Sequence, residues 1–172
     1  MLVTKLKDSK FLLEEAYDLC QEGEYTLALE YYNLILFKDP KNLMALIDKG
    51  VTLQNLGKYR QAIKCYNEAL SLDPTNKTIL LVNKGSALHS IAKYQDAIDC
   101  YDMALTTDSK YAMAIAYKGL ALGELGLLKQ AIKCFNDALR IDKKYDIALN
   151  NKAIALQLLK ANDKPKPKLQ KP

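Results

Sequence analysis

A pattern of about 34 residues recurs along most of this chain. Its most regular member is an alanine, which stands at Ala28, Ala62, Ala97 and Ala131, at intervals of 34, 35 and 34 residues. A fixed period in this range is typical of solenoids, in which short structural units stack on their neighbours. The period therefore predicts a stack of similar units.

The clearest copy of the pattern, residues 42–74, predicts two helices joined by a Gly-Lys-Tyr turn. Small and apolar residues recur at helical spacing in both halves. Pro74 ends the second helix, because proline cannot continue a helix and disfavours helical geometry at the residue before it. The residues that carry the pattern are Leu46, Gly50 and Leu53 in the first helix and Ala62, Tyr66 and Ala69 in the second.

We expect four such pairs of helices, followed by one further helix. In three of the pairs a glycine lets the second helix approach closely, and an aromatic ring fills the groove opposite. These residues are Gly50 with Tyr66, Gly85 with Tyr101, and Gly119 with Phe135. The expected units span residues 9–42, 43–77, 78–111 and 112–145, and residues 146–160 form a capping helix.

The chain resembles tetratricopeptide-repeat proteins over residues 9–160. The family pattern W-x2-L-G-x2-Y, A-x3-F and P is matched in the clearest copy by Leu46, Gly50, Leu53, Ala62, Tyr66 and Pro74. Departures include Ala92 at a turn where glycine is usual, and Ser109 and Lys143 where the stop proline is usual. The resemblance implies an all-α, right-handed superhelix that serves as a non-catalytic scaffold for protein–protein interaction.

The sequence contains no pattern that predicts catalysis. It lacks the glycine-rich phosphate loops, the GxSxG nucleophile motif and the HExxH metal motif. The single His89 cannot complete a His-Cys zinc cluster, and no CxxC occurs. We therefore expect no enzyme activity, no cofactor and no metal site.

The positive charge is concentrated at the C-terminal end. The chain has a formal net charge of +5, and residues 160–172 contain five lysines and one aspartate. A nucleic-acid-binding protein usually carries a basic face on the fold itself, so no specific nucleic acid is expected. We predict that residues 1–8 are a short lead-in and that residues 161–172 are a disordered tail. Weak, salt-sensitive contact of the tail with nucleic acid or membrane is an alternative.

The sequence favours a cytoplasmic protein. No run approaches the roughly 18 apolar residues of a membrane-spanning helix. Lysines interrupt the first ten residues before the apolar core of a signal peptide forms. Cys65, Cys100 and Cys134 recur at the same place in successive units, too far apart for disulfides. Reduced cysteines fit an intracellular environment.

If the chain coils as the resemblance implies, the first helix of each pair lines a concave groove. Apolar residues there would receive a peptide or an amphipathic helix of another protein. The alternative is that this apolar stripe only packs one helix against the next. The predicted groove residues are Leu13 and Tyr17; Met44, Ile47, Asp48 and Val51; Ile79, Val82, Asn83 and Ser86; Met113, Ala116, Tyr117 and Leu120; and Ile147, Asn151 and Ile154.

A known groove function of the family is a clamp for the C-terminal carboxylate of chaperone partners, made by Lys, Asn, Asn, Lys and Arg. The matching positions in this chain are Ile47, Val51, Asn83, Met113 and Tyr117, of which only Asn83 agrees. A carboxylate among these residues would stay unpaired, at a cost of several kcal/mol. We therefore do not expect a chaperone partner of this kind.

The last helix suggests a second kind of function. It repeats the first-helix residues Leu149, Ala153 and Leu156, but no partner helix follows it. Two chains that meet through such uncovered ends would form a homo-oligomer or a larger assembly. Self-association is therefore the alternative to binding a separate partner.

Overall fold

The computed structural model describes residues 8–73 and 77–162, and these residues form helices and no strand. Residues 1–7 of the expected lead-in, the stop at Pro74 and residues 163–172 of the expected tail lie outside the described residues. Residues 161 and 162, which were expected in the tail, belong to the last helix. The helices are α1 (Ser9–Gln21), α2 (Tyr25–Lys38), α3 (Leu43–Asn55), α4 (Tyr59–Leu72), α5 (Lys77–Ser90), α6 (Tyr94–Thr107), α7 (Ala112–Glu124), α8 (Leu128–Ile141) and α9 (Asp146–Asn162).

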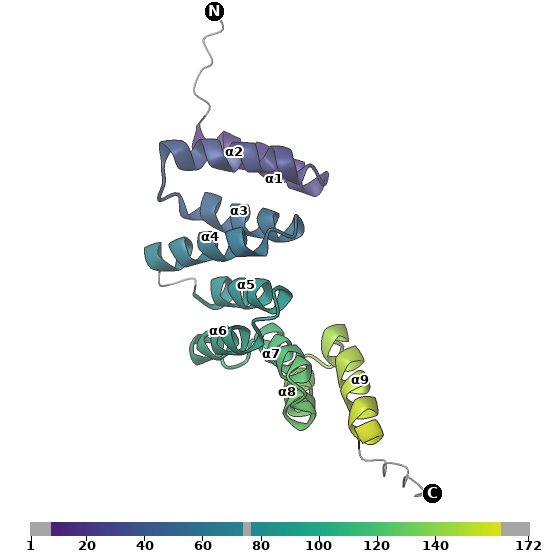
Figure 1. The fold of residues 1–172 in the computed structure, drawn as a ribbon. Coiled ribbons are helices and arrows are strands. Elements are labelled where there is room, and N and C mark those ends of the chain that lie inside the picture. The colour runs from purple at the N-terminus through teal and green to yellow at the C-terminus, as the bar shows by residue number, and fades with distance from the viewer. Residues whose placement is uncertain (1–7, 74–76, 163–172) are drawn as a thin grey trace, which may run out of the picture.

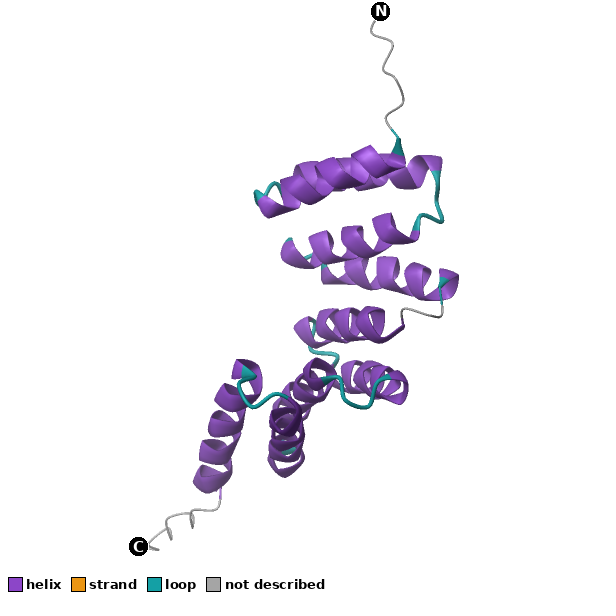
Figure 2. Cartoon of the chain, turned by 180° about the vertical axis from the view of Figure 1, so that it is seen from behind, coloured by secondary structure: helices purple, strands orange, loops and turns teal. Residues whose placement is uncertain are grey.

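The helices stack in chain order, as the repeat predicts. Each helix packs against the next, from α1 at one end of the stack to α9 at the other (Figures 1 and 2). The first helices of neighbouring pairs also contact one another, whereas the described second helices have no such contacts. The stack therefore curves with α1, α3, α5, α7 and α9 on its inner side. This is the expected all-α repeat superhelix.

The core depends on a close contact inside the second, third and fourth pairs. A Cβ atom added to Gly50 would lie 2.5 Å from the Tyr66 ring, and one added to Gly85 would lie equally close to the Tyr101 ring. Both rings are buried. A side chain in place of either glycine would therefore push the second helix away. This confirms the packing role predicted for the glycines.

The second helices end at aspartates, even where proline is missing. Helices α6 and α8 stop at Asp108 and Asp142, although Ser109 and Lys143 replace the usual proline. In each turn the aspartate carboxylate accepts a hydrogen bond from the backbone N–H two residues later, at 2.9 Å. This local bond offers the backbone an alternative to the helix and so ends it.

The turns within the pairs require left-handed backbone. Gly23, Gly57 and Gly126 have φ values of 83°, 69° and 75°. Ala92, which replaces the glycine in the third pair, adopts the same conformation with φ of 59°. A Cβ atom makes this conformation costly, so the repeat geometry overrides the local preference of Ala92.

Two glycines of α7 give a matched test of the packing. In Gly119→Ala the new Cβ would lie 2.7 Å from the buried Phe135 ring, whereas at Gly123 no atom lies within 4 Å. Gly119→Ala is expected to lower the free energy of unfolding by roughly 1–3 kcal/mol. Gly123→Ala should raise it by up to about 1 kcal/mol, since alanine favours helix. Urea denaturation measures both; equal effects would contradict the close-contact account.

The turn at Ala92 gives a second test. Ala92→Gly is expected to raise the free energy of unfolding by roughly 1 kcal/mol, because glycine adopts φ of 59° without the Cβ penalty. Gly57→Ala, at the equivalent turn, is expected to lower it by a similar amount. Thermal or urea denaturation of the two variants checks the sign, and a destabilised Ala92→Gly protein would argue against strain at this turn.

Candidate protein-binding groove

A row of apolar side chains lies exposed near the starts of the first helices. Met44 of α3 and Ile79 of α5 stand at equivalent positions and are 58% and 57% exposed. Met113 of α7 and Ile147 of α9 continue the row and are partly buried. Because the first helices contact one another, these residues follow one another along the inner side of the stack.

Val82 does not belong to this accessible row. It is only 1% exposed and lies in the hydrophobic core that α5 shares with α6 and α7. The expectation that Val82 faces a partner is therefore corrected: its position packs one first helix against its neighbours. Leu13 and Ile47, at the equivalent positions of the first two pairs, are also partly buried against the core.

A second row of the inner side is polar. It contains Asp48, Asn83, Tyr117 and Asn151, at equivalent positions of four first helices, and all four are partly buried. The Asn151 amide donates a hydrogen bond of 2.8 Å to the backbone oxygen of Ile147. Part of its hydrogen-bonding capacity is thus used within α9, while its side-chain oxygen remains available as an acceptor.

The structure brings Tyr17, Asp48 and Val51 together at the N-terminal end of the groove. They line a cavity of about 360 Å³ between α1, α2 and α3. The side chains that the sequence analysis did not identify as part of it are Cys20, Gln21, Tyr25, Tyr32, Thr52 and Asn55. Cys20 lies one helical turn beyond Tyr17, so extension of the predicted stripe by three residues would have found it.

Hydrogen bonds link the walls of this N-terminal cavity. The Thr52 hydroxyl donates to the backbone oxygen of Asp48 at 2.8 Å. The Cys20 sulfur lies 3.3 Å from the Thr52 oxygen and 3.8 Å from the Tyr32 hydroxyl. Since Thr52 already uses its proton, the thiol donates to Thr52 and the Tyr32 hydroxyl donates to the sulfur. These bonds fix α1 and α2 against α3.

The position of Cys20 carries different chemistry in each first helix. The equivalent residues are Cys20, Gln54, His89 and Gly123, and the equivalent aromatic residues of the second helices are Tyr32, Tyr66, Tyr101 and Phe135. Tyr66 donates a hydrogen bond to the Gln54 side-chain oxygen, so the second pair is linked at the same place as the first. At Gly123 no atom lies within 4 Å of an added Cβ atom, and this position is open.

A second cavity, of about 400 Å³, lies at the C-terminal half of the groove. It is lined by Ser86, His89, Tyr101, Tyr117, Leu120, Ile147 and Asn151. The sequence analysis did not place His89 and Tyr101 there, although His89 again lies one turn beyond a predicted residue. The His89 Nε2 atom is buried and has no hydrogen-bond partner among the described residues. The two cavities thus lie at opposite ends of the predicted groove.

Burial shifts the titration of groups along the groove. It raises the pKa of the Asp48 carboxyl above its ordinary 3.8. Burial also raises the pKa of the Tyr32 and Tyr66 hydroxyls, and the neighbouring Asp48 charge contributes to both shifts. The tyrosines therefore stay neutral at physiological pH. Ionised Asp48, by contrast, is held in a site that disfavours its charge.

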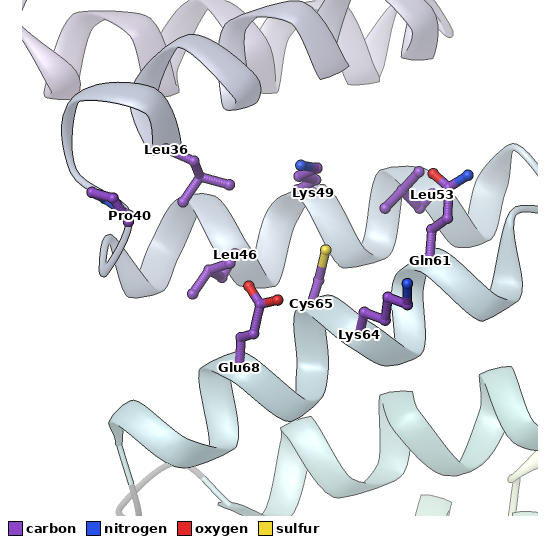
Figure 3. Close-up of a pocket in the computed structure, with 9 residues that line it drawn as sticks. All are labelled: Leu36, Pro40, Leu46, Lys49, Leu53, Gln61, Lys64, Cys65 and Glu68. Carbon is purple, nitrogen blue, oxygen red and sulfur yellow. The ribbon is translucent and has the colours of Figure 1, made fainter.

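A third cavity lies on the opposite side of α3. It holds about 390 Å³ between the first two pairs, and Figure 3 shows Lys49, Cys65 and Glu68 among its lining residues. Burial is the largest effect on the Cys65 thiol and raises its pKa, while the Lys49 charge lowers it. Cys100 and Cys134 are shifted in the same direction for the same reason. All four cysteines of the chain are free of disulfide bonds. The raised pKa of Cys65, Cys100 and Cys134 disfavours the reactive thiolate there.

The described residues show no sign of a metal centre or a membrane span. No three His, Cys, Asp or Glu side chains gather there as a metal site. Within the same part of the chain, no helix is long and apolar enough to cross a bilayer.

The chain matches models of known repeats. Family models described as tetratricopeptide repeat match residues 44–76 and 118–145. The chain therefore contains tetratricopeptide repeats. No curated protein gives a match to the sequence.

Solved tetratricopeptide-repeat structures share its fold. The crystal structure of MamA protein superimposes with a TM-score of 0.79 at 24% identity, covering 90% of this chain and 84% of MamA. The first repeat domain of Spaghetti (RPAP3), bound to the HSP90 peptide SRMEEVD, gives 0.65 at 28% identity, covering 71% and 96%. The second domain of human RPAP3, in complex with the HSP70 peptide SGPTIEEVD, gives 0.61 at 29% identity, covering 64% and 92%.

The partly buried carboxylate of Asp48 is expected to make the stability of the fold depend on pH. Its folded-state pKa lies above the unfolded value, so the ionised carboxylate destabilises the fold above that pKa and the penalty is relieved as the pH falls through it. Asp48→Asn is therefore expected to raise the free energy of unfolding at pH 7, and the gain should shrink toward pH 3.8. Asparagine already occupies the equivalent positions Asn83 and Asn151.

Urea denaturation of both proteins at several pH values measures this difference. Glu68→Gln, which removes an exposed carboxylate from α4, is the matched control and is expected to change stability little. A destabilised Asp48→Asn protein at pH 7 would contradict the account.

Proposed function

We propose that this chain is a non-catalytic adaptor that holds a peptide or an amphipathic helix of another protein in its inner groove. The observation that carries the proposal is the exposure of Met44, Val51 and Ile79 on adjoining first helices, where the fold itself does not use them. Exposed apolar side chains that gather on one surface mark an interaction site.

The residues of this row suit a varied apolar partner. Methionine is unbranched and adapts its shape to what it contacts, and Met44 and Met113 stand at equivalent positions of α3 and α7. Partly buried Tyr117 and Asn151 add hydrogen-bonding groups beside them. A segment with apolar side chains on one face would bury these residues and still find polar partners for its backbone.

Related domains support a peptide ligand, but of a different kind. The two RPAP3 domains are bound to chaperone peptides that both end in EEVD. At the positions of the family's carboxylate clamp, this chain has Ile47, Val51 and Met113, without a cationic side chain. The groove of this chain thus suits an apolar segment better than an acidic terminus.

Substitution in the exposed row tests the proposal. Peptides are selected from a random library on phage against the wild-type chain, and their affinity is measured for Ile79→Glu. Binding should fall at least tenfold, because a charge in an apolar contact stays unpaired. Since Ile79 is exposed, the variant should melt as the wild type does. Phe37→Glu, at an 86% exposed position of α2 outside the groove, is the control. Equal binding by both variants would contradict the proposal.

The clamp positions give a negative prediction. The peptide SRMEEVD, which the Spaghetti (RPAP3) domain binds, is expected not to bind this chain at micromolar concentration. Its terminal carboxylate would meet Ile47, Met113 and Tyr117 at the positions of the two lysines and the arginine of the clamp. Fluorescence anisotropy with the labelled peptide measures this, with the RPAP3 domain as positive control. Tight binding would mean that other cations supply the clamp.

Self-association is the second candidate function. In α9 the side chains of Leu149, Ala153 and Leu156, which in earlier pairs would face a second helix, are exposed. A second copy that covers this face would give a concentration-dependent oligomer. Sedimentation equilibrium distinguishes the two candidates, because a monomer at all concentrations would argue against this one.

A further inference from the structure

We propose that the cavity at the N-terminal end of the groove binds a lysine or arginine side chain of the partner, with Asp48 as its counter-ion. The inference rests on the proposed function and deepens it, because it assigns one end of the groove to a positive charge. The occupant is then a basic residue of a separate protein, placed beside the apolar residues that fill the exposed row.

The shape of the cavity suits one long side chain. Its volume of about 360 Å³ is bounded by residues of α1, α2 and α3. Cavities of roughly 300–1,000 Å³ hold whole small ligands, so there is room here for a single extended residue. Tyr17, Tyr25 and Tyr32 line it together with Val51. The methylene stem of a lysine or arginine packs well on such apolar and aromatic surface.

Asp48 supplies a charge that forms no ion pair with another described residue. The ion pairs formed between described residues are Lys10–Glu14, Lys93–Asp96, Lys118–Asp102 and Arg140–Asp137, and Asp48 is in none of them. The next residue, Lys49, lines the cavity on the opposite side of α3. Burial already disfavours the Asp48 charge by raising its pKa. An unpaired, half-buried carboxylate is costly, and a cation that enters the cavity would remove that cost.

The other groups of the cavity favour a cation over a neutral donor. Ionised carboxylate only accepts hydrogen bonds, and bonds to it from lysine or arginine are about twice as strong as neutral ones. Tyrosine rings attract a cation through their faces. The hydroxyl and thiol groups of Tyr32, Cys20 and Thr52 are already bonded to one another. No residue that lines the cavity carries a positive charge.

The C-terminal cavity provides an internal contrast. It has a similar volume and is lined by Ser86, His89 and Asn151, without an acid. In the third pair, Asn83 stands where the second pair has Asp48. Asp48 is thus the one acidic residue among those that line the two cavities. Glu14, the residue equivalent to Asp48 in α1, is paired at 3.9 Å with Lys10. This asymmetry fixes the direction in which a partner segment would lie.

Selection of peptides tests the assignment. The random phage library is selected in parallel against the full wild-type chain and against Asp48→Asn. The wild type should select a lysine or arginine at a fixed distance from apolar residues, and Asp48→Asn should not. Replacement of that basic residue by norleucine should weaken binding to the wild type roughly tenfold. It should leave binding to Asp48→Asn unchanged, because the two changes remove one interaction. Glu68→Gln, which removes a charge on the other side of α3, should bind as the wild type does.

Each result has a distinct meaning. If Asp48→Asn binds the selected peptides as tightly as the wild type does, while Ile79→Glu does not, the groove stands and the cation site is wrong. If the chain forms oligomers that Asp48→Asn abolishes, the cation comes from a second copy, and the assignment to a separate partner is overturned.

A small probe tests the site without any peptide. Nα-acetyl-lysine N-methylamide, in which the side-chain ammonium group stays charged, is titrated into the isotope-labelled chain and compared with its norleucine analogue. The lysine compound should shift the amide signals of Tyr17 and Asp48 several-fold more than the norleucine compound does, and Asp48→Asn should remove the difference. Equal shifts, or none from either compound, would overturn the proposal even if the groove itself binds peptides.

Discussion

The contact between a first-helix glycine and the aromatic ring of its second helix determines how this protein is built. At Gly50 and Gly85 the ring lies where a side chain would otherwise stand, so the helices of a pair pack closely. Close pairing repeated along the chain produces a stack in which only the first helices contact one another across units. The inner groove is a consequence of that packing.

The repeat made most of the fold predictable from the sequence. Period and helical spacing identified the pairs, the turn between them and the packing glycines. The sequence did not reveal which residues take over the structural roles of the missing prolines and of the missing turn glycine. Asp108 and Asp142 end helices where proline is missing, and Ala92 adopts a glycine conformation. In a solenoid, neighbours on both sides hold a unit in place, so single deviations are tolerated.

The groove was harder to predict than the fold. Helical spacing placed Met44, Ile79 and Val82 on related faces, but it could not say how deeply each one sinks between neighbouring first helices. Val82 is sealed in the core, whereas Ile79 is exposed. The cavities depend on residues from several helices, such as Cys20 and Tyr32, that meet only when the stack forms. Which charged residues form ion pairs also depends on the assembled structure. Asp48 forms none with another described residue.

The central claim is that the inner side of the first helices binds the partner, and the methionines allow a direct measurement of it. Met44 and Met113 lie on the inner row, whereas Met103 of α6 is 55% exposed and lies on a second helix outside the groove. With carbon-13 in the methionine methyl groups, a selected peptide should shift the NMR signals of Met44 and Met113 and leave that of Met103 unchanged. Shifts confined to Met103 would show that the partner binds elsewhere and would contradict the account.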